Sequence, residues 1–87
     1  MRFRRIVCSP EVREKLYAKH DLALSEVEEA ALGTPRLERE GELYHLYGRT
    51  DSGRYLHVIL RDIGDGTGRV VTAYSMKASE RRLYNKK

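Results

Sequence analysis

Four side chains that suit phosphate chemistry lie on stretches that we expect to be neighbouring strands. His57 can move a proton near neutral pH, Arg49 can hold a phosphate through two hydrogen bonds, and Tyr47 and Tyr74 carry a ring and a hydroxyl. RNA cleavage needs a base for the ribose 2′-OH, cations for the charged phosphorane and an acid for the leaving oxygen. These residue types therefore indicate RNA strand scission without a metal.

The net charge of the chain is concentrated in its last twelve residues. The 87-residue sequence has a formal net charge of +4, and residues 76–87 hold five Lys and Arg side chains and one Glu. A local positive field attracts a polyanion, most commonly nucleic acid. We therefore expect Lys77, Arg81 and Arg82 to contact RNA, with Tyr84 as a stacking ring. The alternative is a solvated basic helix that only keeps the protein soluble.

The strands that must position these residues lie between residues 43 and 74. Strands are predicted over 43–49, 54–61 and 69–74, separated by turn signals at 50–53 and 65–68. An odd loop at 51–53 places Tyr47 opposite His57 and Arg49 opposite Tyr55, with the leucines on the other face. A one-residue slip would bury charges among the leucines, so the odd register is favoured by several apolar burials of about 1.5–3 kcal/mol each. Tyr47 and Arg61 on the polar face are further RNA-binding candidates.

The remaining elements are expected to pack around that sheet. A short strand is predicted over 2–8, and Ser9 followed by Pro10 is typical of a helix start, with the helix running to about His20. Residues 25–28 read as a capping box for a second helix, which 33–35 closes. Residues 35–41 form an edge strand or a loop, and a last helix starts near Ser79. The expected class is α+β, as one domain over residues 1–87.

Several other classes of protein and site are disfavoured. The sequence has no CxxC, HExxH, nucleophile elbow or phosphate-binding glycine motif. His20, His45 and His57 lie on different elements without supporting carboxylate spacing, so neither a metal nor another cofactor is expected. The single cysteine, Cys8, suits a reducing compartment, and no apolar run is long enough to cross a membrane. We expect a soluble cytoplasmic protein whose modest core leaves room for a homodimer.

Three segments resemble a known family. Residues 19–30 are similar to the KHG-x-S-x-EEA segment of the BrnT family, residues 48–54 to its GRSDDGR hairpin, and Ala73 with residues 80–84 to its closing A-R and ERR-x-Y signature. These segments occur in the family's order and near its spacing, over roughly residues 10–84. BrnT proteins are the toxin halves of bacterial type II toxin–antitoxin pairs.

The resemblance implies a RelE-like fold, in which an N-terminal strand and two helices pack on an antiparallel sheet that a C-terminal helix follows. It also implies a ribonuclease that cleaves mRNA, either free or on the ribosome, inhibits translation, and is neutralised by a ribbon-helix-helix antitoxin. Carried over by position, its functional residues are His20, Arg49, Arg81, Arg82 and Tyr84. Combined with the face analysis, this gives His57, Arg49, Tyr74 and Arg81 as catalytic candidates. The RNA-binding candidates are Lys77, Arg82, Tyr84, Tyr47, Arg61 and His20.

The sequence departs from the family pattern at two places. Residues 7–10 stand where the family has a Trp-Asp pair, and Tyr74 stands where it has an arginine. If that arginine stabilises the transition state, its loss weakens, redirects or abolishes cleavage. Two alternatives therefore stay open: a non-catalytic module that binds RNA or the ribosome, and a protein-interaction module whose basic C-terminus meets an acidic partner.

Overall fold

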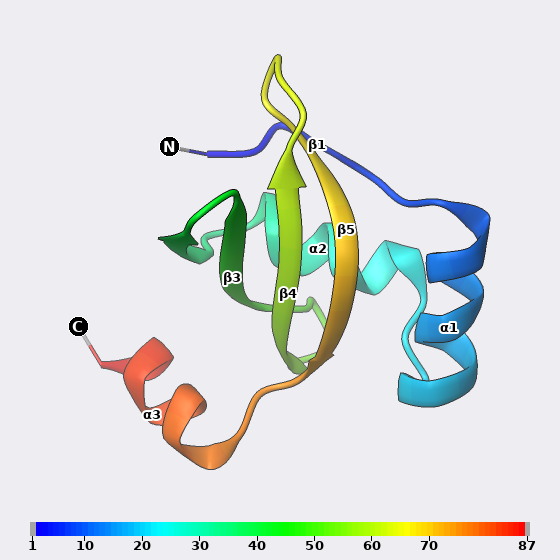
Figure 1. The fold of residues 1–87 in the computed structure, drawn as a ribbon. Coiled ribbons are helices and arrows are strands. Elements are labelled where there is room, and N and C mark those ends of the chain that lie inside the picture. The colour runs from blue at the N-terminus through cyan, green and yellow to red at the C-terminus, as the bar shows by residue number, and fades with distance from the viewer. Residues whose placement is uncertain (1, 87) are drawn as a thin grey trace.

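The computed structural model describes residues 2–86 and is built on one five-stranded sheet with three helices (Figure 1). The strand order across the sheet is β1-β5-β4-β3-β2. Neighbouring strands run antiparallel, except that β1 is parallel to β5. The predicted α+β class is confirmed. The strands are β1 (Arg5–Val7), β2 (Arg36–Glu40), β3 (Leu43–Arg49), β4 (Tyr55–Asp62) and β5 (Thr67–Ser75).

The predicted register of the central hairpin is confirmed. Tyr47 pairs with His57 and Arg49 with Tyr55 across β3 and β4. Leu46 and Val58, which face the other way, are fully buried. Hydrophobic alternation therefore set the register, because a slip of one residue would have exposed every leucine of this pair of strands.

Four strand predictions are corrected in their bounds, and the smallest change is in β4, which is Tyr55–Asp62 and not 54–61. The first strand is only Arg5–Val7. At its start, the backbone N–H groups of Arg4 and Arg5 both donate to the Gly66 carbonyl in the β4–β5 turn, and regular pairing with β5 begins only at Arg5. The 35–41 segment is an edge strand, Arg36–Glu40, since it pairs in register with β3. β5 is longer than predicted, and its pairing with β4 shifts at Ile59 and Leu60. Such an irregularity leaves one residue of β5 outside the pairing pattern.

Helices α1 (Pro10–His20) and α2 (Leu24–Leu32) follow β1. As predicted, Ser9 caps α1, and its side chain accepts the Val12 N–H at 3.2 Å. The predicted start of α2 is wrong by two residues, because the N-cap is Ala23 and not Ser25. α2 begins at Leu24, because the Glu26 carboxylate accepts the Ala23 N–H at 3.1 Å and closes the first turn there.

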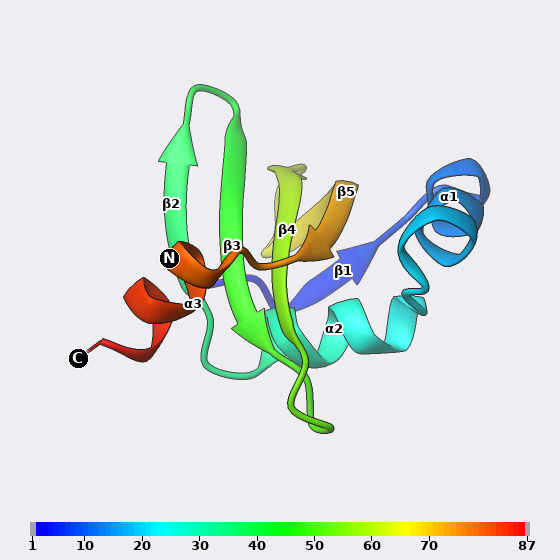
Figure 2. The ribbon, with the colours of Figure 1, turned by 90° about the horizontal axis from the view of Figure 1, so that it is seen from below.

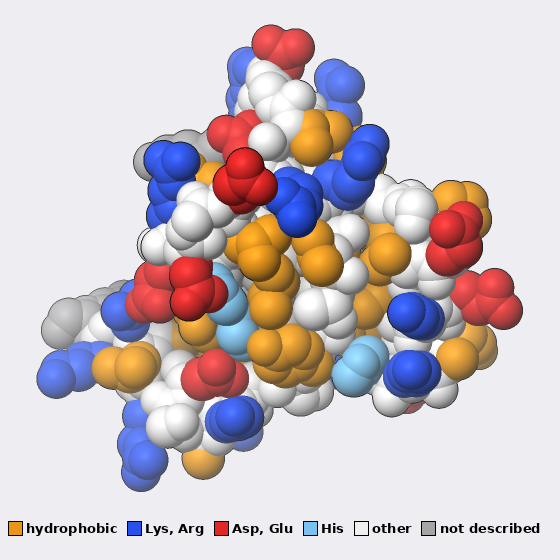
Figure 3. Space-filling model, viewed as in Figure 1, with side chains coloured by type: hydrophobic (Ala, Val, Ile, Leu, Met, Phe, Trp, Pro, Cys, Tyr) orange, Lys and Arg blue, Asp and Glu red, His pale blue; other side chains and the backbone are white. Residues whose placement is uncertain are grey.

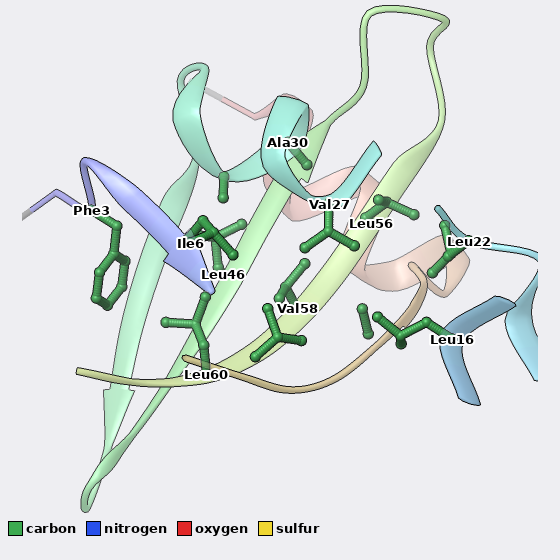
Figure 4. Close-up of a cluster of buried hydrophobic side chains, with 13 residues drawn as sticks. Phe3, Ile6, Leu16, Leu22, Val27, Ala30, Leu46, Leu56, Val58 and Leu60 are labelled. Atoms are coloured by element: carbon green, nitrogen blue, oxygen red, sulfur yellow. The ribbon is translucent and has the colours of Figure 1, made fainter. Parts of the chain in front are cut away.

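The core lies between α2 and one face of the sheet, which we call the core face (Figure 4). Val27 and Ala30 of α2 meet Leu46, Leu56 and Val58, all at most 1% exposed. Gly48 permits this approach: a Cβ there would lie 2.4 Å from the Ala30 carbonyl oxygen. Phe3, Ile6, Leu16, Leu22 and Leu60 extend the same cluster.

Helix α3 (Ala78–Asn85) lies against the opposite face, which we call the site face, beside β3 (Figure 2). It starts one residue before the predicted Ser79, because Lys77 is its N-cap and the Glu80 carboxylate accepts the Lys77 N–H at 2.9 Å. Cys8 is partly buried against the core, and burial raises the pKa of its thiol. Among residues 2–86, no helix has the length and apolarity needed to cross a membrane.

Candidate functional site

A single row of polar and aromatic side chains crosses four strands of the site face. Arg36 of β2 pairs with Tyr47 of β3, Tyr47 with His57 of β4, and His57 with Tyr74 of β5. Strict alternation puts all four side chains on the same face, opposite the leucines. Figure 3 shows this face, with histidine and hydrophobic side chains near its centre and Lys and Arg side chains around them.

His57 lies at the centre of this row and is buried. Its ring stacks on Tyr47 at 4.5 Å between centroids and meets Tyr74 edge-on at 4.7 Å. The residue is only 4% exposed. Burial lowers the pKa of His57 below its ordinary value of 6.5, although the carboxylate of Glu80 acts in the opposite direction. The predicted catalytic imidazole is therefore neutral at pH 7 and shielded from solvent.

Both ring nitrogens of His57 face other ionisable side chains. His57 Nε2 lies 2.8 Å from His45 Nδ1, and His45 Nε2 lies 2.8 Å from Glu40 Oε1. On its other side, His57 Nδ1 lies 3.3 Å from Glu80 Oε2. That last contact is close enough for an ion pair but is not aligned as a hydrogen bond, and within residues 2–86 His57 Nδ1 has no hydrogen-bond partner.

A second cluster forms around Tyr55, one step along the same face. The Arg81 guanidinium carbon lies 4.3 Å from the Tyr55 ring centre and that of Arg49 lies 5.5 Å from it. Tyr84 meets the ring edge-on at 5.9 Å. The neighbouring Asn85 amide, with Arg49 and Arg81, lowers the pKa of the Tyr55 hydroxyl. The cluster thus joins cations from a strand and from α3 around one aromatic ring.

Few contacts hold α3 on this face. Glu80 faces His57, the Arg36 guanidinium donates to the Leu83 carbonyl at 3.4 Å, and the Tyr84 hydroxyl donates to the Thr34 carbonyl at 3.4 Å. A cleft of about 960 Å³ lies between α3, the end of α2 and the β3–β4 turn, and Arg49 and Tyr84 are among its lining residues. α3 therefore borders an open, polar space next to the Tyr55 cluster.

The other predicted residues are spread along the site face. His20, at the end of α1, is exposed and its ring lies 6.4 Å from that of Tyr74. Lys77 and Arg82 are exposed at the start and on the outer side of α3. Arg61 is at the far end of β4, paired with Glu42 at 3.2 Å. The structure therefore brings His57, Tyr47, Tyr74 and His20 together, and Arg49, Arg81 and Tyr84 together, and leaves Arg61 apart.

Sequence reasoning missed three residues of this site: His45, Tyr55 and Glu80. His45 was considered only as a metal ligand, yet the predicted register already places it diagonal to His57, within reach of a ring. Tyr55 was recognised only as the partner of Arg49. Glu80 was counted as one negative charge, although its position three residues after Lys77 is that of a capping residue.

The arrangement can position phosphate and transfer a proton. Arg49 and Arg81 supply cations, and burial, followed by the charge of Glu80, raises the pKa of Tyr74, so that its hydroxyl keeps its proton at neutral pH. In the described part of the chain, no three His, Cys, Asp or Glu side chains gather as a metal site would require.

The same α+β fold is found in a ribonuclease toxin. The crystal structure of the ribonuclease toxin BrnT from Brucella abortus, determined at 1.1 Å resolution, superposes with a TM-score of 0.69. The alignment covers 84% of this chain and 96% of that one, with 17% sequence identity. The BrnT-like fold expected from the sequence is thereby confirmed. No family model and no curated protein matches the sequence.

Proposed function

We propose that this chain is the toxin of a type II toxin–antitoxin pair and that it cleaves RNA without a metal. Two observations support the proposal. The fold is shared with a ribonuclease toxin. The corner between the sheet and α3 combines guanidinium groups, aromatic rings and an uncharged tyrosine in the manner that RNA binding and cleavage require. The second observation carries the proposal, because a shared fold alone does not fix an activity.

The phosphate is assigned to the Tyr55 cluster. Arg49 and Arg81 approach the same ring from different elements, and Arg49 also lines an open cleft. Two guanidinium groups held in this way can bind the phosphate and stabilise the extra charge of the phosphorane. The Tyr84 ring next to them offers a surface on which an unpaired base can stack.

Proton transfer is assigned to Tyr74 of β5 and to His20 at the end of α1. The 2′-OH oxygen attacks phosphorus, the bond from phosphorus to the 5′ oxygen breaks, and a 2′,3′-cyclic phosphate and a 5′-OH result. Tyr74, which keeps its proton, is suited to protonate the leaving 5′ oxygen. His20 is the nearest exposed imidazole and is suited to accept the 2′-OH proton. His57 lies behind Tyr74 and does not meet RNA in this arrangement.

The partners follow from the proposed activity. The substrate would be mRNA, free or on the ribosome, and its loss would halt translation in the cytoplasm. An antitoxin of the ribbon-helix-helix class would neutralise the protein. An antitoxin segment that covers the Tyr55 cluster would block the proposed phosphate site, which gives the proposal a direct link between antitoxin binding and loss of cleavage.

A second candidate is an RNA-binding module without catalysis. It is favoured by Tyr74, which replaces the arginine of the BrnT pattern, and by the burial of His57. Binding that weakens with salt but never cleaves would support this candidate. A third candidate, in which the basic C-terminus holds an acidic protein, predicts no RNA binding at physiological salt.

The test is induced expression in a bacterial host, with growth and total-RNA integrity as readouts. Wild type is compared with Arg81→Ala/Arg82→Ala, and with the charge-matched control Arg5→Ala/Arg13→Ala on β1 and α1. We expect growth arrest and RNA loss with wild type and with the control, but not with the α3 variant. Normal growth and intact RNA with well-expressed wild type would contradict the proposed activity.

A further inference from the structure

We propose that His45, His57 and Glu80 form a hydrogen-bonded series that seats α3 on the sheet and so positions Arg81 over Tyr55. If the chain cleaves RNA as proposed, these three are positioning residues, which act through Arg81 and do not touch RNA themselves. The series runs from the β2 edge to the start of α3, through the contacts Glu40–His45, His45–His57 and His57–Glu80.

A count of protons decides how the series is arranged. Three contacts need three protons, but two neutral imidazoles carry only two. One contact must therefore lack a proton when both rings are neutral. If it is the His57–Glu80 contact, a bare nitrogen faces a carboxylate inside the protein. If it is the His45–Glu40 contact, the bare nitrogen lies at the edge of the sheet. If it is the His45–His57 contact, two bare nitrogens face each other 2.8 Å apart, which is unfavourable.

The exposures of the two carboxylates favour the second arrangement. The Glu40 side chain is 78% exposed and can turn to water, whereas the His57 side chain is 5% exposed and Glu80 is 21% exposed. A buried polar atom without a partner costs more than an exposed one. His57 therefore carries its proton on Nδ1 and donates toward Glu80, while its Nε2 accepts the N–H of His45 Nδ1. The lowered pKa of His57 agrees with a neutral ring in this position.

Glu80 transmits this contact to the helix. One of its carboxylate oxygens accepts the Lys77 N–H at 2.9 Å and closes the first turn of α3, while the other lies 3.3 Å from His57 Nδ1. For the second contact to become a hydrogen bond, the carboxylate would have to rotate while it keeps the first. Arg81 is the next residue, and its guanidinium lies on the Tyr55 ring. α3 buries none of its described residues, and its first turn meets the sheet through the Glu80 contact and through Arg81 on the Tyr55 ring.

Other charged groups around His57 do not change this arrangement. From β2, Glu38 raises the pKa of His57, and from α3, Lys77 lowers it. Tyr47 of β3 and Tyr74 of β5 cover the ring and stay uncharged at neutral pH, because burial raises the pKa of both hydroxyls. Burial and Lys77 thus favour the neutral ring, whereas Glu38 and Glu80 favour the charged one.

The tautomer of His57 in the wild-type chain is the first test. Two-bond ¹⁵N–¹H correlation spectra of the ¹⁵N-labelled protein at pH 7.5 distinguish the two neutral forms of histidine, and a His57→Gln variant assigns the signal. We expect the form with the proton on Nδ1. The form with the proton on Nε2, or a charged ring, would overturn the proposal whether or not the chain cleaves RNA.

Variants of His45 test the positioning role. His45→Leu cannot donate to His57, whereas the amide of His45→Asn can take the place of the Nδ1–H group. With His45→Leu we expect His57 to lose its single tautomer, the Arg81 side-chain signals to lose the ring shift from Tyr55, and RNA cleavage to fall about 10- to 100-fold in kcat. His45→Asn should restore all three readouts. The exposed Glu42→Gln variant is the matched control and should change none of them.

The outcomes separate this proposal from the proposed function. If wild type shows the Nδ1–H tautomer and a ring-shifted Arg81 but cleaves no RNA, the hydrogen-bonded series stands and the ribonuclease assignment fails. If cleavage is present and His45→Leu leaves the Arg81 shift and kcat unchanged, the positioning role fails. Should His45→Leu not fold, Glu80→Gln replaces it, since it leaves only one acceptor for Lys77 and His57.

Discussion

Helices α2 and α3 lie on opposite faces of the same sheet, but different forces hold them. α2 inserts Val27, Ala30 and Ala31 into the core, all at most 1% exposed. α3 buries no described residue and rests on hydrogen bonds, the contact between Glu80 and His57, and aromatic edges. Apolar burial of about 25 cal/mol per Å² is lost only on unfolding, whereas exposed polar contacts exchange readily with water. The core face therefore supplies stability, and the site face keeps its cations free to meet a ligand.

The largest loss of stability should come from Gly48→Val, which acts where α2 packs on the core face. A Cβ at residue 48 would lie 2.4 Å from the Ala30 carbonyl oxygen and 2.9 Å from the Ala30 carbonyl carbon, so α2 would have to leave the sheet. We expect a loss of about 3 kcal/mol in the free energy of unfolding, measured by urea denaturation. Arg69→Val, at an exposed strand position, is the control and should change stability by less than about 0.5 kcal/mol. A stable Gly48→Val protein would show that α2 is not tightly packed.

A matched pair of truncations compares the two helices directly. Val27→Ala on α2 removes fully buried methyl groups and should cost about 2 kcal/mol. Leu83→Ala on α3 removes a side chain that is 54% exposed and should cost less than about 0.5 kcal/mol. Equal losses, measured by thermal and urea unfolding of both variants, would mean that α3 contributes to the core and that the contrast between the helices is wrong.

Acid should reveal the buried imidazole of the site face. Because burial lowers the pKa of His57 in the folded state, the unfolded chain binds more protons below about pH 6.5, and stability must fall as the pH drops through that window. We expect His57→Phe to flatten this part of the curve when urea midpoints are measured from pH 7.5 to 5. Parallel curves for the variant and wild type would contradict a buried, neutral His57.

The smallest effect should come from the far end of the site face. Arg61 pairs with Glu42, and the two side chains are 50% and 87% exposed. Exposed pairs contribute little, so Arg61→Ala should change stability by less than about 1 kcal/mol. If RNA is held at the Tyr55 cluster, the same variant should change RNA affinity by less than about threefold. A loss as large as that of Arg81→Ala, measured by titration with a labelled oligonucleotide, would extend the RNA site along the whole face.

The sequence was informative about the hairpin because its side chains alternate strictly. Tyr47, His57 and Arg49 could be placed on one face from the leucines between them, and the predicted pairs are those observed. The burial of His57 could not be predicted in that way. It depends on the position of α3, which no local pattern specifies, and on rings from two other strands, β3 and β5. Tyr55 and Glu80 were overlooked for the same reason, because their roles arise only where α3 meets the sheet.

The measurement that tests the central claim most directly is cleavage of a single-stranded RNA by the purified chain in the presence of a chelator. Wild type is compared with Arg49→Ala/Arg81→Ala and with the control Arg5→Ala/Arg13→Ala, after all three are shown to fold. We predict products with 2′,3′-cyclic phosphate ends from wild type and the control, and a loss of at least about 100-fold in the site variant. Equal cleavage by all three proteins would contradict a phosphate site at the Tyr55 cluster, and no cleavage by any of them would contradict the ribonuclease assignment.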